Sequence, residues 1–341
     1  MKAWVIDKIC DLAEEANPLK WVELPKPSPG DGELLLRIKA CGVCHTEIDE
    51  IEGRTLPPVL PVVPGHQVVG IVEQSRGRQS RIKEGDRVGV AWIWSACGKC
   101  DFCLTGRENL CPYFKATGRD VNGGYAEYMV VPERFAYPLP EIFNHAEAAP
   151  LLCAGAIGYR SLVLCNTENG KNIGMTGFGA SAHLVLKLIK YLYPASGVYV
   201  FARNPNERRF AMELGAVWAG DTEDKPPVLP DCIIDTTPAW KPVVFALQFL
   251  KPGGRLVINA IRKEDTDRDF LHNIDYPAHL WMEKEIKTVG NVTSSDVRNF
   301  IAVAAEMPFK PEVEKYSFDN ANRAIMDIKK KKIKGGKVLV L

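Results

Sequence analysis

Apolar residues form short runs over roughly the first 140 residues, and alternating strand-like and helix-like patterns after them. The runs ELLLRIKA, HQVVGIVE and DRVGVAW are separated by turn-rich segments such as PSPGDGE and RTLPPVLPVVPGH. Short apolar runs between Pro and Gly clusters predict β-strands joined by loops. We therefore expect a β-rich first domain, built as a partly open barrel that carries long loops.

The pattern changes near Glu147. Buried-strand patterns at 172–176, 198–202, 232–235 and 254–259 alternate with helical patterns at 180–192 and 206–214. Such alternation predicts an α/β fold with a doubly wound parallel sheet. After about Gly290 we expect a helix at 295–306, a strand near Val313, another helix and a last strand at 337–341. The expected domains cover residues 1–150, joined by the returning tail 291–341, and residues 151–290.

Length and composition are those of a globular protein of about two domains. Lys plus Arg number 43 and Asp plus Glu 42, so the formal charge of +1 gives no reason to expect nucleic acid or a membrane surface as a partner. The N-terminus lacks a signal-peptide core, and no apolar stretch is expected to approach the roughly 20 residues of a membrane helix. We expect a cytoplasmic protein, in which clustered cysteines bind metal rather than form disulfides.

Four of the ten cysteines lie within one short run, CGKCDFCLTGRENLC, at the spacing C-x2-C-x2-C-x7-C. Four thiolates complete the tetrahedral shell of zinc, so this set is expected to stabilise a loop and to catalyse nothing. An iron–sulfur cluster is the main alternative, although a ferredoxin run has three residues before its last cysteine, not seven. The predicted ligands of the structural zinc are Cys97, Cys100, Cys103 and Cys111.

A second set of possible ligands, Cys44, His66 and Cys153, is widely spaced in the sequence. Two cysteines and one histidine leave one zinc position open for a substrate oxygen, as catalytic sites do. Glu47 is placed to accept a hydrogen bond from the second ring nitrogen of His66. Each residue also has a simpler interpretation: His66 as a histidine in a turn, Cys153 as a cysteine of the core and Glu47 as a carboxylate on the surface.

The segment Gly177-Phe178-Gly179-Ala180-Ser181-Ala182 follows one predicted strand and opens a helix. It matches G-x-G-x-x-G/A, in which glycines let the backbone approach the pyrophosphate of a dinucleotide at the helix N-terminus. The alternative is that residues 177–182 form a tight turn and bind no dinucleotide. The next strand ends in Ala202-Arg203 rather than in an acidic residue, which favours NADP(H) over NAD(H); Arg203 could equally stack on the adenine or lie in solvent.

Taken together, the motifs CGVCHTE, PGHQVVG, the four-cysteine run, GGYAEY, LLCAGAIGYR and TGFGASAH resemble the zinc-dependent alcohol dehydrogenases of the medium-chain dehydrogenase/reductase superfamily. The resemblance covers essentially the whole chain. It implies a GroES-like catalytic domain and a Rossmann domain, usually in dimers or tetramers. It also implies two zinc ions per chain, with Cys44, His66 and Cys153 around the catalytic one, and reversible oxidation of an alcohol with hydride transfer to NAD(P).

The resemblance also assigns further roles. Thr46 corresponds to the hydroxyl that relays the substrate proton, and Trp92 lies on the segment that lines the alcohol pocket; Trp94 is a second wall residue or a core residue. Four positions depart from the family: Gln67 replaces a Glu, Asp49 a relay histidine, Ile157 a threonine and Ser181 often a valine. The aromatic walls favour unbranched or aromatic alcohols. A polyol dehydrogenase, a zinc-free quinone reductase and a non-catalytic NADP(H)-binding redox sensor are the alternatives.

Overall fold

The computed structural model describes the chain except residues 78–80, 180–181, 309 and 331–334. The chain divides into two compact units: residues 1–156 with 292–341, and residues 157–291. The first boundary lies six residues after the position expected from the sequence. Cys153 therefore belongs to the same unit as Cys44 and His66, and all three candidate ligands can be described within one body.

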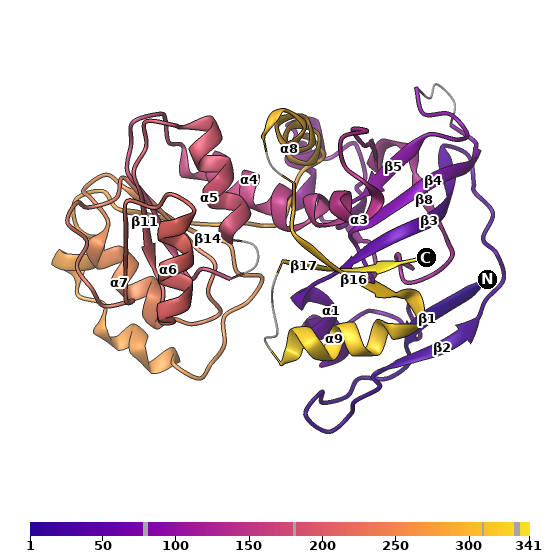
Figure 1. Cartoon of the computed structure of the whole chain (residues 1–341), viewed down its shortest axis with the longest axis horizontal. Coiled ribbons are helices and arrows are strands. Elements are labelled where there is room, and N and C mark those ends of the chain that lie inside the picture. Colours follow the sequence, from indigo (N-terminus) through magenta and orange to yellow (C-terminus); the bar gives the residue numbers. More distant parts are fainter. Residues whose placement is uncertain (78–80, 180–181, 309, 331–334) are drawn as a thin grey trace. The chain divides into compact units, whose positions relative to one another are not determined.

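The first unit is built on a sheet of seven strands in the order β16-β17-β3-β4-β5-β9, with β8 paired to β3 (Figure 1). The last strand pairs antiparallel with β3, so the C-terminal tail returns to this sheet. Its elements are β1 (Lys2–Ile6), β2 (Leu19–Glu23), β3 (Glu33–Val43), α1 (His45–Ile51), β4 (Val68–Ser75), β5 (Arg87–Val90), β6 (Ile93–Ser95), α2 (Asp101–Leu104), β7 (Lys115–Ala116), β8 (Tyr128–Pro132), β9 (Ala136–Pro138), α3 (His145–Ala148), α8 (Ser294–Glu306), β16 (Val313–Ser317), α9 (Ala321–Lys329) and β17 (Gly336–Val340).

The core of the first unit forms where apolar faces of these elements meet. In α9, Ala321, Ala324, Ile325 and Ile328 recur at helical spacing and are buried against the core that contains Leu36 of β3. Helix α8 begins at a capping box, in which Thr293 and Asp296 satisfy backbone N–H groups of its first turn. The helices expected at 295–306 and after Val313 are thus present.

The second unit contains a six-stranded sheet in the order β12-β11-β10-β13-β14-β15, parallel throughout. Its inner strands are continuous apolar runs because helices cover both faces of such a sheet. The predicted doubly wound sheet is confirmed, while β12, α7 and β15 were not anticipated. The elements are α4 (Ala154–Cys165), which begins just before the boundary, β10 (Ile173–Thr176), α5 (Ala182–Leu192), β11 (Val198–Phe201), α6 (Pro205–Glu213), β12 (Trp218–Gly220), β13 (Cys232–Asp235), α7 (Lys241–Phe249), β14 (Arg255–Ile258) and β15 (Glu285–Thr288).

One helical stretch, His145–Cys165, is long and apolar enough to cross a membrane by length and composition. The expectation that no apolar stretch approaches 20 residues is therefore wrong. This stretch is mostly buried in the protein, and it joins α3, a 3-10 turn and α4, with a break in helical geometry at Cys153. Burial of this kind is typical of a core helix, so the stretch is weak evidence for a membrane span.

Candidate active site and metal centres

Cys44, His66 and Cys153 come together in the first unit, with their ligand atoms all within 4.8 Å of one another. His66 Nε2 lies 3.6 Å from the Sγ of Cys44 and 3.3 Å from the Sγ of Cys153. Zinc bonds of about 2.0–2.3 Å at tetrahedral angles separate such donor atoms by about 3.5–3.8 Å. The donor set and its spacing fit a zinc ion with three protein ligands.

Local structure explains how these three side chains are positioned. Cys44 is the N-cap of α1, and its Sγ accepts a hydrogen bond from the Thr46 N–H at 3.3 Å. His66 follows Gly65, whose φ of +98° is reserved for glycine and whose added Cβ would lie 2.3 Å from the ring of Tyr125. Cys153 ends the 3-10 turn at Ala149–Leu152. Each ligand therefore stands where a regular element begins or ends.

Glu47 serves both the helix and the histidine. One carboxylate oxygen accepts the Cys44 N–H at 2.7 Å, completing a capping box. The other lies 2.7 Å from Nδ1 of His66, close enough for an ion pair, although neither atom meets hydrogen-bond geometry. Burial lowers the pKa of His66, but Glu47 and Cys44 outweigh it and raise that pKa well above its ordinary value. Glu47 thus lies against the second ring nitrogen of His66, where a carboxylate can orient an imidazole, and its hydrogen bond to that nitrogen stays a prediction.

Two further residues of α1 have different surroundings. Thr46 is half-buried and lies in the first turn, beside Cys44. Asp49 is buried, and its Oδ1 accepts a hydrogen bond from Nε of Arg54 at 2.7 Å, while its carbonyl accepts the N–H groups of Arg54 and Thr55. Through these hydrogen bonds Asp49 stabilises the turn that follows α1. This contact is structural, and the expected part of Asp49 in a proton relay stays a prediction.

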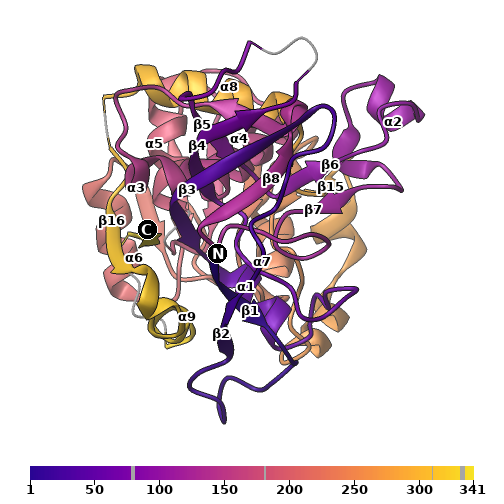
Figure 2. The ribbon, with the colours of Figure 1, turned by 90° about the vertical axis from the view of Figure 1, so that its right-hand side faces the viewer.

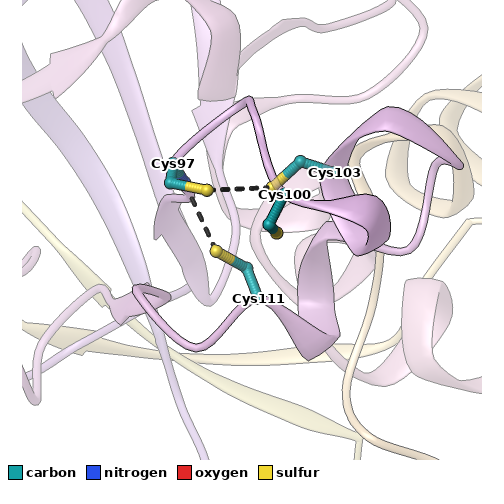
Figure 3. Close-up of side chains that lie close together, drawn as sticks. All are labelled: Cys97, Cys100, Cys103 and Cys111. Atoms are coloured by element: carbon teal, nitrogen blue, oxygen red, sulfur yellow. Dashed lines mark hydrogen bonds between the residues drawn. The ribbon is translucent and has the colours of Figure 1, made fainter.

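The four-cysteine run forms a lobe on β6, α2 and β7, seen at the outer edge of the first unit in Figure 2. Figure 3 shows the four cysteine side chains pointing toward one another, and all four sulfurs lie within 4.8 Å. The sulfurs of Cys97 and Cys103 are 3.9 Å apart, close to the sulfur separation in a tetrahedral zinc shell. Gly98 and Gly106 have φ of +74° and +69°, which allows the tight turns between the ligands.

Electrostatics and anchoring both suit a structural role for this lobe. Backbone N–H groups, that of Lys99 first, lower the pKa of the Cys97 thiol to about 6, whereas burial raises the pKa of Cys103 to about 12. A bound metal would deprotonate all four thiols. Buried Glu108, inside the lobe, accepts the N–H of Ser294 at 2.8 Å. The lobe therefore holds the start of α8, where the chain re-enters the first unit.

Replacing Cys100 by serine is expected to remove the metal of the lobe, because one weak oxygen ligand replaces a thiolate. We expect bound zinc to fall from two to one per chain. The melting temperature should fall by on the order of 10 °C. In a unit of about 200 residues, each kcal/mol lost from the free energy of unfolding lowers the melting temperature by roughly 2–4 °C. Elemental analysis and calorimetry measure both effects, with Cys10→Ser, a half-buried thiol outside both clusters, as the control. Unchanged zinc content would contradict the assignment, and iron with visible absorbance would favour the cluster alternative.

The predicted dinucleotide turn lies in the second unit, between β10 and α5. Gly177 has φ +77°, and an added Cβ would lie 2.9 Å from a methyl carbon of Thr237. An added Cβ on Gly179 would meet no atom of the described, non-adjacent residues within 4 Å. Space over the backbone is what close approach of a pyrophosphate needs. Phe178 and Ala182 are buried in the unit, and Ala180 and Ser181 lie outside the described residues.

The end of β11 carries no acidic side chain. Ala202 is buried and Arg203 is exposed. Arg208 donates hydrogen bonds to the carbonyls of both and is paired with Asp221. Arg208 therefore fixes the turn after the strand, and Arg203 is exposed beside it.

The two tryptophans expected to line the alcohol pocket differ. Trp94 donates a hydrogen bond from its Nε1 to the Val130 carbonyl at 3.0 Å and packs against the main core, so its role is structural. Trp92 is half-buried, and its ring is tilted by 33° against that of Phe114. The guanidinium of Arg119 lies over the Trp92 ring, 5.1 Å from its centre. Its buried Nε1 has no hydrogen-bond partner among the described residues.

Three buried charged residues with chemical interest were missed from the sequence. Glu50, at the end of α1, is 1% exposed. Its spacing of four from Thr46 was the available signal, since such residues share a helix face. Asp235 and Lys263 form a buried ion pair at the carboxyl end of β13. No local motif signals that pair, because its members are joined only by the fold.

Comparison with known proteins covers both units. The profile of the alcohol dehydrogenase GroES-like domain matches residues 30–141. The chain is 37% identical to a probable alcohol dehydrogenase, AdhA, of Mycobacterium tuberculosis, with 100% of this chain and 97% of that protein covered. It is 34% identical to an alcohol dehydrogenase of Geobacillus stearothermophilus, with 100% and 99% covered. A cinnamyl alcohol dehydrogenase from Sorghum bicolor has the same fold, with a TM-score of 0.86, 28% identity and 99% and 97% of the two chains covered.

Proposed function

Because the chain belongs to the alcohol dehydrogenases of the medium-chain dehydrogenase/reductase superfamily, and is thus an oxidoreductase, we propose that it oxidises primary or secondary alcohols reversibly with zinc and NAD(P). The observation that carries the proposal is the cluster of Cys44, His66 and Cys153 beside Thr46. These three ligands are a set that leaves a zinc position open for chemistry. A four-cysteine lobe adds the second, structural zinc.

In this mechanism the residues of α1 and the turn at 177–182 have distinct tasks. A zinc ion held by the three ligands would polarise the alcohol oxygen as a Lewis acid. Thr46 accepts the hydroxyl proton and passes it toward solvent, and Glu47 keeps the His66 ring in its orientation. Gly177 and Gly179 would hold the pyrophosphate of a nicotinamide cofactor, which when bound would accept the hydride from the alcohol carbon. The product is the aldehyde or ketone.

The test is an initial-rate screen of primary, secondary and aromatic alcohols with NAD and with NADP, on protein of measured zinc content. We expect turnover that depends on one of the two zinc ions. Absence of turnover over the whole panel, in protein that carries two zinc ions and binds a dinucleotide, would instead favour a non-catalytic redox sensor. Such a sensor needs no proton acceptor like Thr46 beside an open metal shell.

Replacing Arg203 by serine is expected to lower kcat/KM for NADP about 10- to 100-fold while that for NAD changes little. A charge-assisted hydrogen bond contributes roughly 1.5–3 kcal/mol, which corresponds to that range. Ala202 adds no negative charge that would repel the 2′-phosphate. Steady-state kinetics with both cofactors measure the ratio, and Arg209→Ser, an exposed arginine of α6, is the control. A wild-type preference for NAD would contradict the proposed cofactor.

We also propose that two copies associate through β15, the edge strand of the second unit, as a homodimer or within a homotetramer. All four residues of β15 are exposed, and among the described strands β15 is the last in its sheet. Exposed apolar side chains lie on the strand, at Ile286, and shortly before it in the sequence, at Trp281 and Met282. A second copy of the same edge would cover both features by antiparallel pairing. Analytical ultracentrifugation tests whether two copies associate.

The proposed location is the cytoplasm, where reduced thiols bind metal.

A further inference from the structure

Among the buried polar atoms of the first unit that have no hydrogen-bond partner in the described part of the chain, four come from three neighbouring side chains: both carboxyl oxygens of Glu50, the hydroxyl of Tyr125 and Nε1 of Trp92. Glu50 is 1% exposed and Tyr125 is 0% exposed. A buried polar group without a hydrogen-bond partner is destabilising, and most such groups in native proteins are paired. Such groups therefore indicate that something outside the protein pairs with them.

These side chains lie around the three-ligand cluster. Glu50 is four residues after Thr46 and three after Glu47, so the three share one face of α1. The ring of Tyr125 packs on Gly65, the residue before His66. Burial first, then Glu47, raises the pKa of Glu50 well above its ordinary value, against the opposing charges of His66 and Arg119.

The pKa of Tyr125 is also raised well above its ordinary value, by burial and by the charges of Glu47, Cys41, Cys44 and Glu50. Both groups thus lie within electrostatic reach of Glu47. Trp92 belongs to the same group through Arg119. The guanidinium of Arg119 contacts the ring of Trp92, and its positive charge lowers the pKa of Glu50. The four unpartnered atoms consequently belong to one neighbourhood beside the metal ligands.

The neighbouring cations do not satisfy Glu50. Arg119 directs its guanidinium to Asp120, with hydrogen bonds of 2.9 and 2.8 Å. Arg54 pairs with Asp49 and Glu52. A purely structural buried acid would be expected to use one of these arginines. Glu50 instead stays on the helix face of Thr46, which is the face of the proposed reaction.

We propose that Glu50 and Tyr125 bind a second hydroxyl group of the substrate, so that the enzyme prefers alcohols with a polar group several bonds from the reacting carbon. The inference rests on the proposed function and narrows its substrate class. A hydroxyl both donates and accepts, so it pairs with Glu50 in either protonation state and with the Tyr125 hydroxyl. Trp92 Nε1 adds a donor beside an apolar wall.

The helix sets the expected span of the substrate. Side chains four residues apart on a helix are separated by roughly 5–6 Å between Cβ atoms. An extended chain with bonds of about 1.5 Å at tetrahedral angles advances about 1.25 Å per bond, so about four to five bonds cover this distance. With Thr46 at the reacting hydroxyl, a terminal diol near 1,4-butanediol is the best match. A plain alkanol would leave the buried acid unpaired, which strongly disfavours such a substrate.

The experiment compares kcat/KM for 1,4-butanediol with that for 1-butanol, on zinc-loaded wild type, Glu50→Leu, Glu50→Gln and Tyr125→Phe. We expect the diol-to-alkanol ratio to fall about 10- to 100-fold in Glu50→Leu, since one lost hydrogen bond to a charged or buried group has that effect. Glu50→Gln keeps a donor and an acceptor and should lie between. Exposed Glu14→Gln is the control and should keep the wild-type ratio. The melting temperature with and without 1,4-butanediol, in the presence of cofactor, is measured on each variant.

The outcomes separate this inference from the proposed function. If both alcohols are turned over and the ratio is unchanged in Glu50→Leu and in Tyr125→Phe, the inference is overturned and the proposed function stands. If neither wild type nor any variant turns over an alcohol, the proposed function fails. The melting temperatures with and without 1,4-butanediol then test whether Glu50 binds the diol. Stabilisation of wild type but not of Glu50→Leu by the diol then supports the inference, and equal shifts overturn it. If Glu50→Leu does not fold, Glu50→Gln and Tyr125→Phe decide by the same criteria.

Discussion

Replacing Cys153 by serine is expected to lower kcat for alcohol oxidation by at least about 10³-fold while the fold survives. Lewis-acid polarisation is worth several kcal/mol of transition-state stabilisation, and each 1.4 kcal/mol is tenfold in rate. Cys153 follows a 3-10 turn, and its Sγ lies 3.3 Å from Nε2 of His66. The substitution therefore removes one of the three ligands and changes no residue of the sheet. Kinetics and zinc content, measured on the same protein, test this.

The zinc content distinguishes the two metal sites in this variant. We expect it to fall from two to one per chain with little change in melting temperature, whereas the lobe variant Cys100→Ser loses stability. Cys10→Ser, again a half-buried thiol in the same unit, should keep activity and both metals. Full activity in a Cys153→Ser protein that retains only one zinc would contradict the assignment of the catalytic ligands.

Much of the fold was predictable because its signals are local. Continuous apolar runs such as IGMT and VYVF lie in buried parallel strands, and Cys232–Asp235 was predicted with the bounds that the structure has. Strand β15 was missed because an exposed edge strand carries no apolar alternation. Helix α7 lies in a stretch to which the sequence analysis assigned no element, and Pro242 stands in its first turn, where proline is tolerated.

The candidate site was predictable where residue type alone restricts the chemistry. The spacing of Cys97, Cys100, Cys103 and Cys111 indicated one cluster, and residue type with the family resemblance indicated the other. Family membership, expected from the motifs, is confirmed by relatives over the full chain. The pairing of Asp49 with Arg54 was not predictable, since many surface arginines follow such helices. Neither was the isolation of Glu50, because an unpartnered carboxyl is defined by every residue around it.

The ion pair of Asp235 and Lys263 leads to the largest expected effect on stability. Asp235 is 0% exposed, at the carboxyl end of β13, and accepts hydrogen bonds from the hydroxyls of Thr176 and Thr237 as well as from Lys263. Lys263 also donates to the Thr237 carbonyl at 2.8 Å. Removing one partner leaves a buried charge unpaired, so Asp235→Asn is expected to cost about 3–5 kcal/mol in the second unit.

A double variant isolates the charge from the hydrogen bonds. The amide introduced by Asp235→Asn would still accept from the two threonine hydroxyls. Combining this change with Lys263→Met should therefore recover at least about 1–2 kcal/mol relative to Asp235→Asn alone, because no unpaired charge remains. Hydrogen exchange of the segment 232–239 is the suitable measurement, since a chain of two units need not unfold in one transition. Additive losses in the double variant would mean that the two side chains stabilise the sheet independently, and that their charges are not coupled across the end of β13.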